Sequence, residues 1–340
     1  MIFDETTKKE FLDGYFVYDG CFGFEEDRYG FLLLENDKNK HQYRDPLPET
    51  QFLFIKTSRS IDERFYAMNT KQFDFSTISA GTAPGKEDFV SVDTGGFVFS
   101  WDNEFENKIP NNIPDCNFIS SIAKVVRVNG YIYALGSGWR IYKREGHVKW
   151  SDNLNSLPVP KDFIDDTAST DYFFRDMAGF SESDLYAVGD AGSVFHFDGK
   201  KWDQLAFPTN IRLTTVTCAG NGQAYISDKN CAVWVGRGAK WKKLTDGDMS
   251  LYFFDSAWFD GQMWFANDYG IWVLENDQLV LAKDSKHKPI PEDVAVLCGR
   301  IDISPDNKRM LICGQRGAAV YDGERWETLF TCDLPIEDEA

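Results

Sequence analysis

The sequence predicts an all-β protein built as a ring of four-stranded antiparallel blades. The first observation is a pattern of strand, glycine turn, strand, second turn and tryptophan-containing strand, most complete in Asp184–Leu205. The second is its recurrence at steps of 42, 54, 39, 39 and 47 residues, measured between Gly96, Gly138, Gly192, Cys231, Gly270 and Gly317. Since one such meander leaves apolar faces uncovered, the copies must stack on each other, and this period is typical of a β-propeller.

Each copy is predicted to form a hairpin around a turn rich in glycine, asparagine or aspartate. These residues tolerate the backbone conformations of tight turns, and apolar side chains alternate with others on both sides of each turn. Six hairpins are predicted in this way: Val90–Asp102, Tyr131–Trp150, Asp184–Leu205, Ala224–Leu244, Met263–Val280 and Met310–Leu329.

Residues 216–244 illustrate the four strands expected in one blade. From the inside outward they are predicted at Val216–Ala219, Ala224–Ser227, Val233–Gly236 and Trp241–Leu244. A tryptophan recurs just after the second turn of four copies, at Trp150, Trp202, Trp241 and Trp326. Large aromatic side chains at a fixed repeat position are expected to fill the space between neighbouring sheets rather than to bind a ligand.

The N-terminal quarter departs from this period. Strands are predicted at Phe31–Leu34, Phe52–Lys56 and Arg64–Met68, and Lys38–Glu49 is predicted to be a long polar loop. We therefore expect one irregular blade in residues 1–84, regular repeats in 85–330 and an acidic tail in 331–340, all in one domain. A chain of 340 residues favours seven blades over six at roughly 45 to 50 residues per blade. The ring is expected to close by pairing N-terminal residues with the last blade.

The N-terminal sequence, the length of the apolar runs and the cysteines indicate the compartment in which the protein is expected. The N-terminus lacks a basic region followed by an apolar stretch, and no run of apolar residues is long enough to span a bilayer, so a cytoplasmic location is expected. The seven cysteines are an odd number without a regular spacing, which predicts reduced and mostly buried thiols.

Motifs for catalysis and cofactor binding are sparse. The four histidines lie in different repeats or loops, and no phosphate-binding loop, nucleophile elbow or zinc-protease motif is present. Acidic pairs occur at Asp165-Asp166, at Glu25-Glu26-Asp27 and at Asp246 with Asp248. Such pairs would suit a glycosidase or a calcium site, but solvated loops explain them better in a chain with 54 acids. The sequence predicts no catalytic residue, no cofactor and no metal.

Charge points instead to a protein partner. The net charge of −18 disfavours direct binding to nucleic acid or to an anionic membrane and favours a basic protein. In a blade, the turn between the second and third strands shares one face with the connections between blades, and acids and aromatics gather there. The predicted partner-binding residues are Asp165, Asp166, Asp190, Asp246, Asp248, Asp268, Trp139, Phe163, Tyr172 and Tyr269. The opposite face also carries acids, and Trp139 and Tyr269 could equally cover the ends of the core.

Residues 85–330 resemble a β-propeller with kelch-like or tryptophan-aspartate-like spacing, as in Gly199–Trp202 and Gly323–Trp326. By size, acidity and repeat style the whole chain is similar to the large immunity proteins of bacterial contact-dependent growth inhibition systems, in particular those that guard against EndoU-type ribonuclease toxins. This resemblance implies a protein that covers the RNA-binding cleft of a basic nuclease domain. The alternatives are a propeller hydrolase, glycoside-active or metal-assisted, and a general scaffold for protein complexes.

Overall fold

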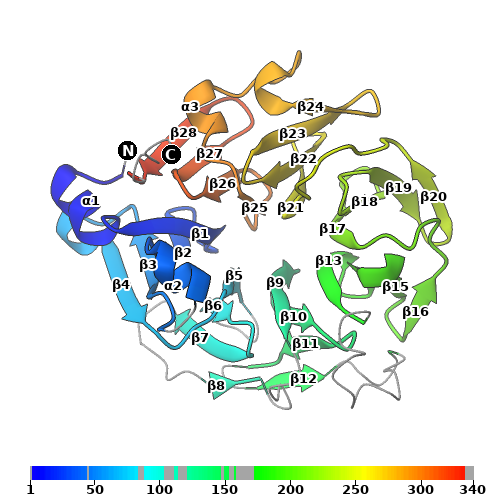
Figure 1. Cartoon of the computed structure of the whole chain (residues 1–340), viewed down its shortest axis with the longest axis horizontal. Coiled ribbons are helices and arrows are strands. Elements are labelled where there is room, and N and C mark those ends of the chain that lie inside the picture. Colours follow the sequence, from blue (N-terminus) through cyan, green and yellow to red (C-terminus); the bar gives the residue numbers. More distant parts are fainter. Residues whose placement is uncertain are drawn as a thin grey trace.

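The computed structural model describes residues 2–43, 46–82, 88–102, 111–113, 121–146, 149–152, 157 and 172–333. Its strands form seven four-stranded antiparallel sheets, arranged as blades around a common centre (Figure 1). The predictions of an all-β propeller and of seven blades rather than six are confirmed. No helix in these ranges is both long and apolar enough to span a membrane.

Every blade uses four strands that follow one another in the chain, and the first strand of each lies innermost (Figure 1). Blades 1 to 4 consist of β1 (Tyr15–Phe22), β2 (Arg28–Glu35), β3 (Thr50–Lys56) and β4 (Phe65–Thr70); β5 (Thr77–Gly81), β6 (Asp88–Val92), β7 (Phe97–Asp102) and β8 (Asn111–Asn112); β9 (Ile122–Val128), β10 (Tyr131–Gly136), β11 (Ile141–Arg144) and β12 (Trp150–Asp152); and β13 (Phe174–Ser181), β14 (Asp184–Gly189), β15 (Val194–Phe197) and β16 (Trp202–Leu205). Blades 5 to 7 consist of β17 (Leu213–Cys218), β18 (Ala224–Asp228), β19 (Val233–Arg237) and β20 (Lys240–Lys243); β21 (Asp255–Phe259), β22 (Gln262–Asn267), β23 (Gly270–Glu275) and β24 (Gln278–Leu281); and β25 (Arg300–Ile303), β26 (Met310–Gly314), β27 (Gly317–Tyr321) and β28 (Trp326–Thr331).

Short helices lie at the ends and in the connections. They are α1 (Glu5–Phe11), α2 (Lys38–Tyr43), α3 (Glu292–Ala295), η1 (Ile61–Glu63), η4 (Asp190–Gly192) and η5 (Ala282–Asp284). The turn at η4 explains one glycine of the repeat. Gly192 has φ +68°, and a Cβ there would lie 2.0 Å from the carbonyl oxygen of Thr209, so no other residue fits without a shift of the backbone.

The N-terminal blade is more regular than the sequence suggested. Its four strands all pair in order, and the first of them, β1, was not among the predicted strands. The register of β1 with β2 shifts between Val17 and Asp19, and this bulge breaks the alternation by which strands are recognised. The predicted loop Lys38–Glu49 contains α2.

The repeated tryptophans pack as predicted. Trp150 and Trp202 are buried, and Trp241 of blade 5 contacts Tyr186 of blade 4 with ring centroids 6.2 Å apart. Trp326 of blade 7 contacts Trp264 of blade 6 at the same centroid distance. These rings fill the space between adjacent sheets, so the interpretation as core residues is confirmed.

Closure of the ring differs in detail from the expectation. Among the described residues blade 7 contains only β25 to β28, and the N-terminal segment adds one backbone hydrogen bond, from Ile2 N to Leu329 O at 2.9 Å. The ring of Phe3 stacks on Phe65 and meets Phe330 edge-on, at centroid distances of 4.3 and 5.2 Å. The N-terminus therefore joins blades 1 and 7 mainly through side-chain packing.

The ring has two faces that differ in their loops. We call the face with the turns between second and third strands, together with the connections between blades, the connection face; the other is the hairpin face. Backbone hydrogen bonds link neighbouring loops of the connection face, as between Trp139 N and Tyr172 O at 3.1 Å. The connection after β24 does not stay on the connection face alone. Its Lys288 pairs with Asp260 in the turn between β21 and β22, which belongs to the hairpin face, so this connection extends toward the hairpin face.

Candidate functional site

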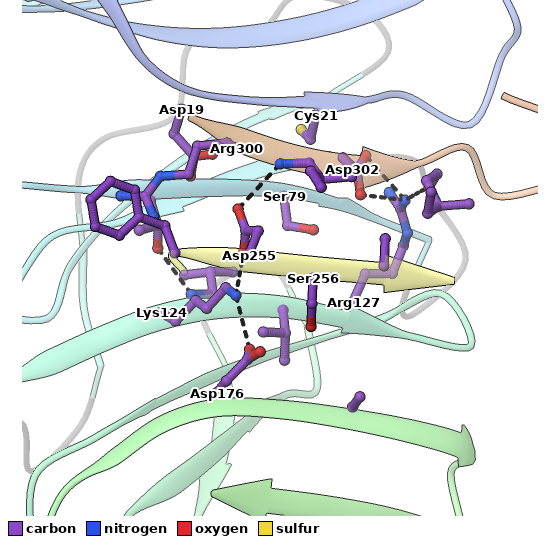
Figure 2. Close-up of a pocket in the computed structure, with 18 of the residues that line it drawn as sticks. Asp19, Cys21, Ser79, Lys124, Arg127, Asp176, Asp255, Ser256, Arg300 and Asp302 are labelled. Atoms are coloured by element: carbon purple, nitrogen blue, oxygen red, sulfur yellow. Dashed lines mark hydrogen bonds and ion pairs between the residues drawn. The ribbon is translucent and has the colours of Figure 1, made fainter. Parts of the chain in front are cut away.

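A cavity of about 1410 Å³ lies at the centre of the ring, and the inner strands line it. Figure 2 shows charged side chains from several of these strands pointing toward one another inside it. Four are aspartates, Asp19, Asp176, Asp255 and Asp302, and three are the cations Lys124, Arg127 and Arg300. Charged side chains are seldom placed among inner strands unless they are paired, so each requires a partner.

These side chains link every inner strand to the next one around the ring. We call these seven charged side chains, together with Thr77, Thr217 and Ser256, the channel belt. One contact joins each pair of neighbouring inner strands: Asp19 Oδ2 with Ile78 N (3.0 Å), Thr77 Oγ1 with Val125 N (2.9 Å), Asp176 Oδ1 with Lys124 Nζ (2.9 Å), Asp176 Oδ2 with Val216 N (2.9 Å), Thr217 Oγ1 with Ser256 Oγ (2.7 Å), Asp255 Oδ2 with Ile301 N (3.3 Å) and Asp302 Oδ2 with Phe22 N (2.8 Å). The last contact joins blade 7 to blade 1 and so completes the circle.

Lys124 holds two carboxylates at once. Its ammonium lies 2.9 Å from Asp176 Oδ1 and 2.5 Å from Asp255 Oδ1 (Figure 2). Burial acts to lower the pKa of Lys124, but these two carboxylates outweigh it and raise that pKa above its ordinary value. Burial raises the pKa of Asp176, although Lys124 opposes the shift. Lys124 is therefore a charged link between blades 3, 4 and 6.

The two arginines of the belt act in the same way at other points of the ring. Arg127 on β9 reaches Asp302 on β25, with Nη2 3.1 Å from Oδ1, and donates to the carbonyl oxygen of Ile303 at 2.5 Å. Burial acts to lower the pKa of Arg300, but the fields of Asp255 and Asp19 raise it. The belt thus carries four acids against three cations, so the surplus carboxylate favours uptake of a proton as the pH falls.

Asp19 is the carboxylate expected to take up that proton. Burial raises its pKa to about 6, against the opposing effect of Arg300. Because this folded-state pKa lies above the unfolded value, the contribution of Asp19 to stability is largest at low pH and is lost as the pH rises through 6. Between about pH 4.5 and pH 7.5 that loss amounts to about 2 kcal/mol.

We therefore expect Asp19→Asn to remove about 2 kcal/mol of the pH dependence of the free energy of unfolding. The asparagine retains an acceptor for one of the two amides, Gly20 N and Ile78 N, that Asp19 binds at 2.8 and 3.0 Å. Urea unfolding of the unaltered protein and of Asp19→Asn at about pH 4.5 and pH 7.5 measures how steeply the free energy of unfolding of each changes with pH. Equal slopes would contradict the assignment of a raised pKa to Asp19.

The belt is engaged in holding the ring together. Each of its four carboxylates accepts a hydrogen bond from a backbone amide of the neighbouring blade. Lys124 and Arg127 contact three of these carboxylates, and Arg300 interacts electrostatically with Asp255 and Asp19. Within the part of the chain that the structure describes, no three histidine, cysteine or acidic side chains come together as a group that could hold a metal ion. The side chains that remain exposed to a partner lie at the mouths of the channel.

Aromatic side chains surround the mouth on the connection face. The ring of Phe75 lies 5.8 Å from that of Tyr18, and Tyr252 meets Phe254 at 5.3 Å. Between these pairs the Arg300 guanidinium lies 5.6 Å from the Tyr18 ring and 4.7 Å from the Phe254 ring. Phe75 and Tyr252 remain 38% exposed above this support. We call these four aromatic residues, together with Tyr269, the aromatic mouth.

Tyr269 extends the aromatic mouth outward and is 80% exposed. It occupies the turn between β22 and β23, where its amide donates to Asn267 Oδ1 at 2.9 Å. The side-chain amide of Asn267 in turn donates from Nδ2 to the carbonyl oxygen of Leu251 at 3.1 Å, next to Tyr252. Asp268 in the same turn is exposed as well. Of the predicted site residues, Asp268 and Tyr269 thus lie together at the mouth, and Tyr269 does not cover the core.

Asp190 occupies a different environment from the exposed acid that the sequence suggested. It is buried, and its carboxylate contacts Arg175 Nη2 at 2.7 Å and Arg212 Nε at 2.6 Å. The cause is the sharp turn at η4, which directs Asp190 inward toward β13 and the connection before β17. The groups exposed at this place are therefore Arg175 and Arg212 rather than a free carboxylate of Asp190.

The other predicted residues are distributed around the connection face. Trp139 is 8% exposed and packs edge-on against Tyr172, with ring centroids 4.8 Å apart, so it covers the end of the core. Asp246 and Asp248 are exposed in the connection before β21, and Asp246 pairs with Lys243 at 3.0 Å. Asp165, Asp166 and Phe163 lie outside the described residues.

Sequence analysis missed the channel belt and most of the aromatic mouth. A signal for the belt exists, because an acid, a hydroxyl or a lysine recurs within each inner strand, as with Thr77, Lys124, Asp176 and Asp255. Tyr18, Phe75 and Phe254 come from three different blades or connections, and nothing local in the sequence brings them together.

The thiols agree with the prediction where the structure describes them. Six of the seven cysteines are free and five of these are buried, while Cys116 lies outside the described residues. Burial raises the pKa of Cys231 and of Cys332 to about 12. Thiols in this state are weak nucleophiles.

Comparison with known proteins gives one similarity in sequence and several in fold. The chain is 25% identical over 176 residues to the immune protein Tsi7 of Pseudomonas aeruginosa, a match that spans 51% of this chain and 55% of Tsi7. The chain thus covers about half the length of this curated relative. No family model matches it.

Solved structures share the fold at low sequence identity. A catalytically inactive virginiamycin B lyase from Staphylococcus aureus, solved with quinupristin, has a TM-score of 0.62 and 10% identity over 89% of this chain and 93% of that one. Raptor from Chaetomium thermophilum has a TM-score of 0.57 and 9% identity over 95% and 28% of the two chains. The C-terminal WD40 domain of Sif2 has a TM-score of 0.52 and 12% identity over 92% and 83%. At these identities the likeness concerns the propeller fold alone.

Proposed function

We propose that this chain is an immunity protein that binds a toxin and neutralises it, and that the aromatic mouth of the connection face is its docking surface. The observation that carries the proposal is the similarity to the immune protein Tsi7 over half of each chain. The protein then acts as an inhibitor rather than as an enzyme. The channel belt supports this interpretation, because its charged groups are engaged in contacts between blades.

The aromatic mouth has the chemistry of a protein-binding hot spot. Such surfaces are rich in tyrosine and other rigid aromatic residues, which lose little conformational entropy on binding. Of the six exposed large hydrophobic side chains in the described ranges, Phe75, Tyr252, Tyr269 and Val296 belong to loops of the connection face or its rim. Tyr66 and Phe97, the other two, lie on β4 and β7.

Charge supports a basic toxin. A protein of net charge −18 attracts a basic domain over long range and thereby speeds association. On the hairpin face several acids are already neutralised, for example Glu182 by Lys143 at 3.0 Å. On the connection face Asp248 has no ion-pair partner among the described residues. We propose a ribonuclease domain as the partner, of the EndoU type delivered by a contact-dependent growth inhibition system, and the cytoplasm as the place of action.

Co-expression with the product of the neighbouring reading frame tests the proposal. We expect this chain to restore growth to cells that express that product and to bind the purified toxin domain in a single tight complex. The association rate constant is expected to fall at least tenfold between about 50 mM and 500 mM salt, because screening shortens the range of the attraction. Absence of both rescue and binding at low salt would contradict the proposed function, and rescue by binding without salt dependence would contradict the basic partner.

A further inference from the structure

Two arginines form a cationic pair at the connection-face mouth of a strongly acidic protein. Arg175 is the second residue of β13, the inner strand of blade 4, and Arg212 ends the connection that leads to blade 5. Both share the buried carboxylate of Asp190: Arg175 donates from Nε to Oδ1 at 3.2 Å and from Nη2 to Oδ2 at 2.7 Å, and Arg212 Nε lies 2.6 Å from Oδ1. Two positive charges thus meet one negative charge.

The geometry leaves part of each guanidinium open. Asp190 is 4% exposed and does not line the cavity, whereas Arg175 and Arg212 both do, with side chains 30% and 44% exposed. The guanidinium carbon of Arg175 also lies 3.9 Å from the centre of the Phe173 ring, which fixes its plane. Among the described residues, Arg212 has no side-chain partner other than Asp190. Since its side chain is 44% exposed, part of the Arg212 guanidinium is open to solvent.

Planar guanidinium groups bind an oxyanion through two parallel hydrogen bonds. Among the described residues, Asp190 is the one carboxylate paired with these two guanidinium groups, which leaves one positive charge in excess. A buried carboxylate that orients two guanidinium groups in this way prepares a site for a second oxyanion on the open side. This pair lies at the inner ends of blades 4 and 5. The aromatic mouth lies on blades 1 and 6 and on the connections that lead to blades 2 and 6, so the two occupy different parts of the same opening.

We infer that Arg175 and Arg212 form a carboxylate-binding site, and that on docking it receives an aspartate or glutamate side chain of the toxin. The identity of the partner rests on the proposed function, whereas the existence of the site rests only on the geometry of the two arginines. The negative net charge of this protein attracts a basic domain over long range. The arginine pair then favours the partner whose acidic side chain is correctly placed to reach it. Such a contact adds specificity, because a basic protein without that acid leaves the cationic pair unmatched.

The experiment compares Arg212→Gln with Arg237→Gln in two measurements. Arg237 is a matched control, because it is 43% exposed, pairs with Asp184 and lies over the Phe180 ring, but on the opposite side of blade 5 at the hairpin face. In the first measurement inorganic phosphate, an oxyanion able to form the same paired hydrogen bonds, is titrated while the arginine Nε–H resonances are followed by NMR. We expect saturable shifts at both Arg175 and Arg212 in the unaltered protein. In Arg212→Gln the shift at Arg175 is expected to saturate at a phosphate concentration at least tenfold higher, and in Arg237→Gln both shifts are expected to be unchanged.

The second measurement is the affinity for the toxin domain. We expect Arg212→Gln to weaken binding about tenfold, Arg212→Lys to recover part of the loss, and Arg237→Gln to remain within twofold of the unaltered protein. Unfolding curves show whether the two glutamine variants are equally stable. Phosphate shifts that Arg212→Gln does not alter, or a toxin affinity that it leaves within twofold, would overturn the inference. If the unaltered protein fails to bind the toxin, the proposed function is contradicted, and the phosphate titration alone decides whether the site exists.

Discussion

Replacing Tyr252 or Tyr269 by alanine is expected to weaken toxin binding by about 2 kcal/mol in each case, which corresponds to about a 30-fold rise in Kd. Tyr252 is supported from below by Phe254, and Phe254 by Arg300, so its ring is held in place before the partner arrives. Tyr269 exposes most of its ring and loses that exposure only on binding. Surface plasmon resonance is expected to show the loss mainly in the dissociation rate.

Tyr66→Ala is the matched control for this prediction. Tyr66 is 37% exposed, nearly the same as Tyr252, but it lies on the outer strand β4 against Trp101. We expect its replacement to leave the toxin affinity within twofold. Equal losses at Tyr66 and Tyr252 would mean that the partner does not dock on the aromatic mouth.

Lys124→Met is expected to lower the free energy of unfolding by about 3 to 5 kcal/mol, the largest effect on stability anticipated for one substitution in the belt. The methionine has a similar length, but it leaves the carboxylates of Asp176 and Asp255 without their shared cation. Each would remain charged beside the other or take up a proton, and both outcomes cost free energy. Guanidinium unfolding followed by tryptophan fluorescence measures the change.

Lys201→Met serves as the control for the belt. Lys201 also contacts a carboxylate, Asp203 at 2.8 Å, but its side chain is 60% exposed and that of Asp203 is 51% exposed. A surface pair of this kind contributes about 0 to 1 kcal/mol. We expect Lys124→Arg to retain much of the stability that Lys124→Met loses. A loss at Lys124 no larger than that at Lys201 would show that the belt does not hold the ring together.

The propeller was predictable because its repeats are encoded locally. A turn such as Asp190–Gly192 and an outer-strand tryptophan such as Trp202 each leave a recognisable pattern within a few residues. The N-terminal blade was harder to predict, because β1 contains a bulge and β2 is buried along nearly its whole length. Continuous burial removes the alternation of polar and apolar residues on which strand prediction depends.

The candidate site was only partly predictable. The exposed position of Asp268 and Tyr269 was predictable, since a turn of the connection face follows directly from the strand order, and their role in binding stays a prediction. Asp190 was expected at the surface, but a buried carboxylate cannot be told from an exposed one without knowing that Arg175 and Arg212 converge on it. Contacts between distant blades, such as Lys124 with Asp255, depend on the closed ring and leave no local trace in the chain.

We expect the toxin to dock on the connection face at the aromatic mouth, and amide hydrogen exchange of the protein with and without the bound toxin domain provides the sharpest test of this docking. We predict that binding slows exchange in residues 71–76, 244–254 and 267–270, while the hairpin-face turns 219–223 and 304–309 exchange at unchanged rates. Slower exchange in those hairpin-face turns, with no change in the three segments of the connection face, would contradict the claim.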